Sequence, residues 1–257
     1  MVLGALMCVP TSMWGQCVPA LVSSGDSTGS SYYAPVNNYY NYSLSEMIFD
    51  ADELGGPMVI DTIGFYLGSM NPMTRATDVR IYMKYTQRDG FASTTDYEVV
   101  DESAVLVYSG ALNCAHGWND FALTTPFQYD GDGNVMVIVH DAATGYDGSS
   151  YKFATSSTGS EYKMLVRYSD SSNPLPGSSV YGGSSGRYQY RPVMRMKGCE
   201  ASAPACRRVS GLTVDTVTES SVALSWNDSQ NTGAAYSVYM VRGGEDSLLA
   251  SGFTQTV

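Results

Sequence analysis

The segment Gly25-Asp26-Ser27-Thr28-Gly29 comes closest to a catalytic motif, because it fits the G-x-S-x-G pattern around a nucleophilic serine. In that pattern a sharp turn between a strand and a helix exposes the serine hydroxyl to a histidine base. Here the segment lies in a polar, Ser/Gly-rich stretch over 16–31, and no helical pattern follows it. We therefore expect Ser27 to be a loop residue and not a nucleophile.

A second candidate for catalysis is Cys114 with His116, since residues two apart share one face of a strand. A thiolate–imidazole pair also needs a group that orients the histidine, and nothing near these residues supplies one. The chain has only two histidines, and His140 ends the apolar run 135–140 as a strand-end residue. We expect Cys114 to be half of a disulfide or a buried thiol beside a surface histidine. The sequence predicts no catalytic residue.

The run 130–134 (DGDGN) is the sharpest candidate for a metal site, because oxygen ligands two residues apart begin many calcium loops. Asp130, Asp132 and Asn134 would be the ligands, joined by Asp141 and Asp147 if the fold gathers them. No glutamate follows at the distance an EF-hand requires. The alternative is a hairpin turn, because Asp-Gly and Gly-Asn pairs favour turns. The sequence thus predicts a turn and no cofactor, with structural calcium as the alternative.

Five cysteines are present, and four remain if Cys8 is removed with an export signal. An even number in an exported chain predicts disulfides among Cys17, Cys114, Cys199 and Cys206. Four cysteines allow three pairings, and the sequence does not choose among them. A local bridge between Cys199 and Cys206 is the favoured pairing, and a bridge between Cys17 and Cys199 is its rival.

Tyrosine is unusually abundant, with twenty in 257 residues. A tyrosine ring offers an apolar face with a polar hydroxyl, and binding sites combine apolar surface with a few polar groups. Five tyrosines fall within 32–42, and three more lie within 181–190. The candidate contacts for a glycan or a protein are Tyr39, Tyr40, Tyr42, Tyr181, Tyr188 and Tyr190. The alternative for each is packing across neighbouring strands.

Charge excludes some classes of partner. Lys and Arg number 14 against 25 Asp and Glu, which gives a net charge of -11. Such a surface repels phosphate backbones and anionic lipid, so we expect no nucleic-acid partner. An acidic surface suits divalent cations or serves solubility alone.

The N-terminus resembles an export signal. Residues 1–10 (MVLGALMCVP) form an apolar run of suitable length, and the small Gly15 suits a cleavage site. No basic residue precedes the run, so the signal at 1–15 is interpreted as truncated. The run is too short to span a bilayer, and no other apolar run approaches 18 residues. We expect a secreted or cell-surface protein with no membrane span.

Alternation of apolar and polar residues dominates the region 16–199. Residues 79–85 (VRIYMKY) alternate clearly, whereas 135–140 (VMVIVH) is nearly continuous, as in a strand buried on both faces. Other segments of this kind are 59–67, 105–108, 118–127, 151–153, 164–168 and 188–196. No helical period is sustained. The spacing predicts an all-β fold, a sandwich or jelly roll.

Composition changes after Cys199. Residues 200–208 (EASAPACRR) read as a linker, and a new strand pattern occupies 209–257. That pattern resembles the first half of a fibronectin type III domain, in which a tryptophan fills the core between the sheets. The matching positions are Leu212, Val214, Val222, Leu224, Trp226, Tyr236, Val238 and Tyr239. The resemblance implies a partial fibronectin type III-like sandwich.

The first domain loosely resembles the jelly-roll adhesin-type β-sandwich modules of secreted Bacteroidetes proteins, which accompany gingipain-type proteases. The residues concerned are 39–46 (YYNYSLSE), 60–65 (IDTIGF), 79–85, Gly117-Trp118, Pro126-Phe127 and Tyr129-Asp130. The resemblance implies a bacterial adhesion or ligand-binding module, and it supplies no catalytic residue.

These observations predict a non-catalytic, exported binding protein whose ligand is a glycan or an extracellular protein. The alternative is an accessory region of a larger exported hydrolase, a protease or glycosidase, whose catalytic domain lies outside this chain. A hydrolase within the chain is a third hypothesis, which the scarcity of histidine disfavours.

Overall fold

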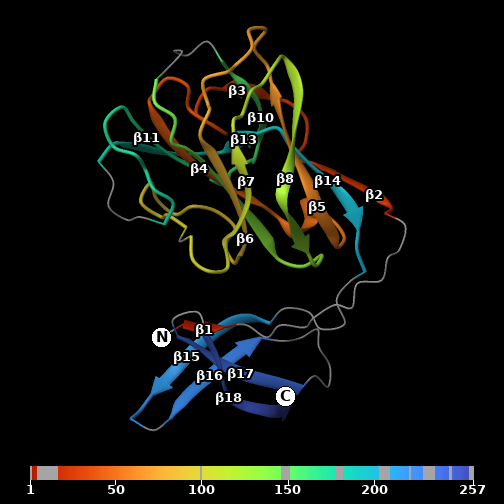
Figure 1. Cartoon of the computed structure of the whole chain (residues 1–257), viewed down its shortest axis with the longest axis vertical. Helices are drawn as coiled ribbons and strands as arrows, with labels where there is room; N and C mark the ends of the chain where they lie inside the picture. Colours follow the sequence, from red (N-terminus) through yellow and green to blue (C-terminus); the bar gives the residue numbers. More distant parts are fainter. Residues whose placement is uncertain are drawn as a thin grey trace. The chain divides into compact units, whose positions relative to one another are not determined.

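The computed structural model describes residues 2–4, 17–98, 100–145, 151–177, 182–202, 209–219, 221–227, 235–242 and 245–254. Within these residues strands dominate, and the one helix, α1 (Ala51–Leu54), has four residues. The prediction of an all-β fold is confirmed. No helix in this part of the chain has the length and apolar character that a membrane crossing needs. The chain divides into two compact units, Cys17–Ala201 and Met1–Gln16 with Ser202–Val257 (Figure 1).

Two antiparallel sheets build the unit Cys17–Ala201 from its described strands. The seven-stranded sheet has the order β13-β10-β5-β14-β2, with β3 on β10 and β8 on β5. Its strands are β2 (Pro19–Ser23), β3 (Gly29–Ser31), β5 (Met58–Leu67), β8 (Gly117–Tyr129), β10 (Phe153–Ser157), β13 (Tyr190–Pro192) and β14 (Met194–Glu200). The six-stranded sheet has the order β12-β11-β4-β9-β6-β7. Its strands are β4 (Tyr42–Phe49), β6 (Val79–Thr86), β7 (Val105–Gly110), β9 (Asn134–Asp141), β11 (Met164–Ser169) and β12 (Ser184–Tyr188).

One apolar core lies between the two sheets. Phe65 of β5 and Met194 of β14 enter it from the seven-stranded sheet, and Ile81 of β6 and Val137 of β9 enter it from the other. All four side chains are fully buried. Alternation places every second residue of a strand on the inner face, so the apolar pattern of the sequence becomes a β-sandwich.

β9 confirms the prediction of a strand buried on both faces. Val135, Val137 and Val139 belong to the core between the sheets. Met136 and Ile138 point to the opposite face and belong to a second apolar cluster. The nearly continuous apolar run follows from this, because neither face of β9 meets solvent.

The described residues of the segment between β6 and β7, 87–98 and 100–104, cover that outer face of the six-stranded sheet. This segment contributes Phe91 and Tyr97 to the second apolar cluster. Under this cover, Arg167 Nη2 donates to Glu46 Oε1 at 3.0 Å, and both side chains are almost fully buried. The guanidinium of Arg167 also lies 4.1 Å from the ring centre of Tyr97. Burial raises the pKa of Glu46 to about 7, although the charge of Arg167 opposes the shift.

The disulfide joins Cys17 to Cys199, across a sequence separation of 182. The favoured pairing of Cys199 with Cys206 is therefore wrong, and the rival pairing is present. Cys206 itself lies outside the described residues. Cys114 is a buried free thiol, and burial raises its pKa to about 12. The bridge ties β2 to β14, which carry the two ends of this unit.

The second unit holds two small antiparallel sheets among its described strands. One pairs β15 (Ser210–Val217) with β16 (Val222–Asn227), and the other has the order β1-β17-β18. The strands of the latter are β1 (Val2–Gly4), β17 (Ala235–Arg242) and β18 (Glu245–Thr254). Trp226 contacts Tyr236, with ring centres 5.3 Å apart. The fibronectin resemblance stays a prediction, and the expected signal at 1–15 lies mostly outside the described residues.

Candidate functional site

Seven tyrosines from distant parts of the sequence meet at one place in the sandwich unit. Four come from the segment that precedes β4, and three from strands β11, β12 and β13. We call them the tyrosine cluster: Tyr32, Tyr33, Tyr39, Tyr40, Tyr168, Tyr188 and Tyr190. Every member has its ring within 6.2 Å of another member's ring, centre to centre.

Five of these rings form a closed circuit of aromatic contacts. Tyr32 lies 4.5 Å from Tyr33, and Tyr33 lies 5.7 Å from Tyr168. Tyr168 lies 4.5 Å from Tyr40, which meets Tyr39 edge-on at 5.3 Å. Tyr39 returns to Tyr32 at 6.2 Å. Each contact lies in the range where aromatic pairs attract one another, so the circuit fixes the orientation of its members.

A branch extends the circuit onto the seven-stranded sheet. Tyr33 stacks on Tyr188 at 5.0 Å, and Tyr188 meets Tyr190 at 5.0 Å. Tyr188 ends β12 in one sheet, and Tyr190 begins β13 in the other. The cluster therefore lies where the chain passes from one sheet to the other.

Buried residues hold the segment that carries Tyr39 and Tyr40. Val36 and Asn37 are fully buried. The Asn37 backbone N–H donates to Ser43 Oγ at 2.9 Å, and Asn37 Oδ1 accepts the Tyr39 N–H at 3.1 Å. The side chain of asparagine stabilises such turns by bonding the backbone two residues on. The two rings thus stand on a defined backbone.

The cluster combines exposed ring surface with hydrogen-bonding groups. Tyr39 is 48% exposed, and the other members are partly buried. The Tyr32 hydroxyl donates to the Tyr33 hydroxyl at 3.3 Å, and Ser31 Oγ lies 3.4 Å from the Tyr190 hydroxyl. Burial raises the pKa of Tyr190, so its hydroxyl keeps its proton at neutral pH. The surface can stack on a flat apolar face and also bond to hydroxyl groups.

The structure brings together four of the six tyrosines predicted as contacts, namely Tyr39, Tyr40, Tyr188 and Tyr190. Tyr42 begins β4 and takes no part in these ring contacts, and Tyr181 lies outside the described residues. The sequence did not indicate Tyr168 as a contact residue, because its position in an alternating strand is typical of a residue that packs within the sheet. Only the pairing of β11 with β4 brings it close to Tyr40.

Two of the calcium candidates, Asp130 and Asp132, lie in the turn between β8 and β9, and Asn134 begins β9. The Asp132 N–H donates to Asp130 Oδ1 at 3.0 Å. Asn134 Oδ1 accepts the Ala51 N–H at 3.0 Å, so this oxygen already has a partner on α1. Asp141 forms a buried ion pair with Arg75, and Asp147 lies outside the described residues. Among described residues, no three His, Cys, Asp or Glu side chains are grouped to hold a metal ion. Structural calcium stays a prediction.

The candidates for catalysis are separate from one another. Ser27 lies between β2 and β3, where its hydroxyl donates to the Gly29 carbonyl at 3.2 Å. Cys114 is buried, whereas His116 is exposed, with its ring 6.1 Å from that of Tyr66. His140 is buried beside Asn173, and burial lowers its pKa.

The tyrosine cluster is consequently the arrangement with the clearest capacity to bind a ligand. No protein-family model, no curated protein and no solved structure matches this chain. The interpretation of the cluster rests on its own geometry and chemistry.

Proposed function

We propose that the sandwich unit, residues 17–201, is a non-catalytic carbohydrate-binding module that works outside the cell. The observation that carries this proposal is the closed circuit of five tyrosine rings with Tyr39 at its exposed margin. A sugar ring has an apolar face of C–H groups and an edge of hydroxyl groups. The cluster offers aromatic faces for the former and hydroxyl groups for the latter.

Charge supports a neutral glycan over an acidic one. The chain carries a net charge of -11. This charge repels carboxylated or sulfated sugars within the Debye length of the solution. A neutral glycan meets no such repulsion. It gains from ring stacking and from hydroxyls that already lie on a rigid support, so little conformational entropy is lost on binding.

The disulfide is compatible with an extracellular protein, and secretion or surface attachment forms part of the proposal. The same surface would serve a larger exported hydrolase as its accessory binding region. In either setting the ligand-binding step is the same, and one experiment tests it.

The experiment is a glycan array probed with the full chain, followed by calorimetric titration of the glycans that bind. We expect Tyr39→Ala to weaken binding by about tenfold or more, which corresponds to about 1.4 kcal/mol. The matched control is Trp118→Ala, because Trp118 is a similarly exposed aromatic residue (36%) on β8, outside the cluster. Binding to no glycan on the array, or equal loss in both variants, would contradict the proposal. Binding of a protein ligand that Tyr39→Ala abolishes would assign the cluster to a protein partner instead.

A further inference from the structure

β2 is the terminal strand of the seven-stranded sheet, and no described strand pairs with its outer edge. Figure 1 shows it beside β14 at the margin of the sheet. It is anchored at both ends. The Glu200 N–H donates to the Val18 carbonyl at 2.8 Å, and the Ser24 N–H donates to the Met194 carbonyl at 2.9 Å. The Cys17–Cys199 disulfide adds a covalent tie beside the first of these bonds.

The register shows which backbone groups of β2 remain available. In an antiparallel pair, opposed residues alternate between hydrogen-bonded and non-bonded pairs. Positions 18 and 24 bond to β14, so positions 20 and 22 do so as well. The backbone groups of Pro19, Leu21 and Ser23 therefore point away from β14. Since proline has no N–H, the outer edge offers the N–H groups of Leu21 and Ser23 and three carbonyl groups.

Pro19 removes one donor at the start of this edge, but the rest of β2 carries little protection. Proteins commonly guard edge strands with charged side chains, bulges or a covering segment. The strand PALVS holds no charged residue, and Leu21 is 64% exposed. Val18, next to the strand, is 51% exposed. An anchored, uncharged edge with no described strand on its outer side is a template on which an extended peptide can add as a further strand.

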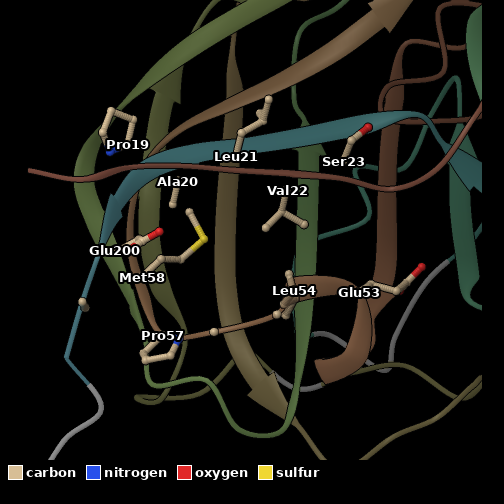
Figure 2. A pocket seen from close by; sticks show the side chains of 13 residues that line it. Pro19, Ala20, Leu21, Val22, Ser23, Glu53, Leu54, Pro57, Met58 and Glu200 are labelled. Carbon is tan, nitrogen blue, oxygen red and sulfur yellow. The ribbon is translucent and has the colours of Figure 1, made fainter.

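A pocket of about 660 Å³ lies against the core side of β2. Figure 2 shows Ala20 and Val22 pointing from β2 towards Met58 and Leu54, whereas Leu21 points the other way. A strand added beyond β2 would have its alternate side chains level with Ala20 and Val22, because side chains alternate across a sheet. These side chains would enter the pocket, which Ala20, Val22 and Pro57 line together with polar groups.

Two carboxylates belong to the same pocket, those of Glu53 and Glu200. Glu200 is exposed. Glu53 is about one-third exposed, but one of its oxygens pairs with Arg191 and the other accepts the Asp50 N–H. Figure 2 shows Glu200 at the Pro19 end of the pocket, where a basic side chain of the incoming strand would lie close to it. A second copy of this chain would instead bring the same two carboxylates and a net charge of -11. Charge therefore favours a different, basic partner over self-association.

We propose that the outer edge of β2 binds an extended segment of a partner polypeptide that combines alternating apolar residues with lysine or arginine. The Leu21 and Ser23 backbone groups bond to the segment, its apolar side chains enter the pocket beside Ala20 and Val22, and its basic side chain faces Glu200. This interaction surface is independent of the carbohydrate-binding proposal, and neither requires the other.

The test is selection of a displayed random peptide library on the full chain, with depletion on the variant Leu21→Pro. This substitution removes the outward N–H without removing a bond to β14, and proline is tolerated on edge strands. The matched control Leu21→Ala shortens the side chain and keeps the N–H. We expect selected peptides to carry the alternating pattern with basic residues, to bind Leu21→Pro about tenfold more weakly or worse, and to bind Leu21→Ala within a few-fold of the unmodified chain.

A second measurement keeps the test valid if Leu21→Pro fails to fold. Synthetic copies of the selected peptides, N-methylated at alternate residues, keep charge and side chains but lose the backbone donors. They should not bind the unmodified chain. Peptides that bind all variants and N-methylated forms equally would overturn the proposal, as would a selection that enriches none. A dimer in analytical ultracentrifugation that Leu21→Pro dissociates would overturn it in favour of a second copy.

Discussion

Removing the disulfide between Cys17 and Cys199 should destabilise the sandwich unit substantially. The bridge spans a sequence separation of 182. In the chain-entropy model, a loop of this length restricts the denatured chain by an amount worth about 5 kcal/mol at room temperature. Removal of a native disulfide typically costs about 2–5 kcal/mol, so we expect Cys17→Ser/Cys199→Ser to lower the free energy of unfolding by about 3–5 kcal/mol. For a unit of this size that corresponds to a loss of about 10 °C in Tm.

The assay is denaturant unfolding of the full chain, with and without a reducing agent. The reductant should bring the unmodified chain to the stability of the double serine variant and should leave the variant unchanged. Hydrogen exchange followed by mass spectrometry locates the effect. We expect amide protection to fall first in β2 and the adjoining part of β14, because β2 has one bonded neighbour among the described strands.

Two outcomes would refute the reasoning. One is a peptide map of the native protein in which Cys199 is linked to Cys206. The other is a coincidence of the unfolding curves in the presence and absence of reductant, which would mean that the bridge does not restrict the denatured chain. If all regions of the unit lost protection equally, the predicted loss of stability would stand, but the prediction that β2 opens first would be wrong.

Two further predictions concern the interior. The pKa of Glu46 rises from 4.5 to about 7 on folding. Its contribution to the free energy of unfolding is therefore full below pH about 4.5 and is lost as the pH rises through about 7, a change of about 3 kcal/mol. Unfolding curves recorded across this range should show a flatter pH dependence for Glu46→Gln, and an unchanged slope would contradict the assignment. A Cβ atom on Gly198 would lie 1.8 Å from the Val59 carbonyl oxygen, so Gly198→Ala should cost about 3 kcal/mol or more. Gly56→Ala, which meets nothing within 4 Å, should change stability by less than about 0.5 kcal/mol in the same thermal scans.

The strand pattern was predictable because alternation is a local signal. β6 alternates between core and outer face, and the run 135–140 was correctly interpreted as buried on both sides. What covers the outer face of β9 was not predictable. Phe91 and Tyr97 reach it from a segment that has no alternation of its own and is held by the pairing of β6 with β7.

The disulfide partner of Cys199 was not predictable from a local pattern. Sequence proximity favoured Cys206 as the partner of Cys199, because only six residues lie between them. Pairing of β2 with β14 instead sets Pro19 opposite Cys199, which brings Cys17 close. No local pattern shows that the first and last strands of a sandwich unit are neighbours. The same limit explains why Tyr168 was not associated with Tyr33 and Tyr40.

The tyrosine cluster and the outer edge of β2 should bind their ligands independently. Tyr190 of the tyrosine cluster and Lys197, which pairs with Leu21, lie on the consecutive strands β13 and β14. No member of the tyrosine cluster belongs to β2, to its partner β14 or to the lining of the pocket beside β2, and substitutions that share no partners usually do not couple. Tyr39→Ala should therefore weaken glycan binding and leave peptide binding at β2 unchanged, and Leu21→Pro should do the reverse. Loss of both activities in either variant would mean that one site was misassigned or that the substitution had damaged the sandwich, and the unfolding curve of that variant separates the two explanations.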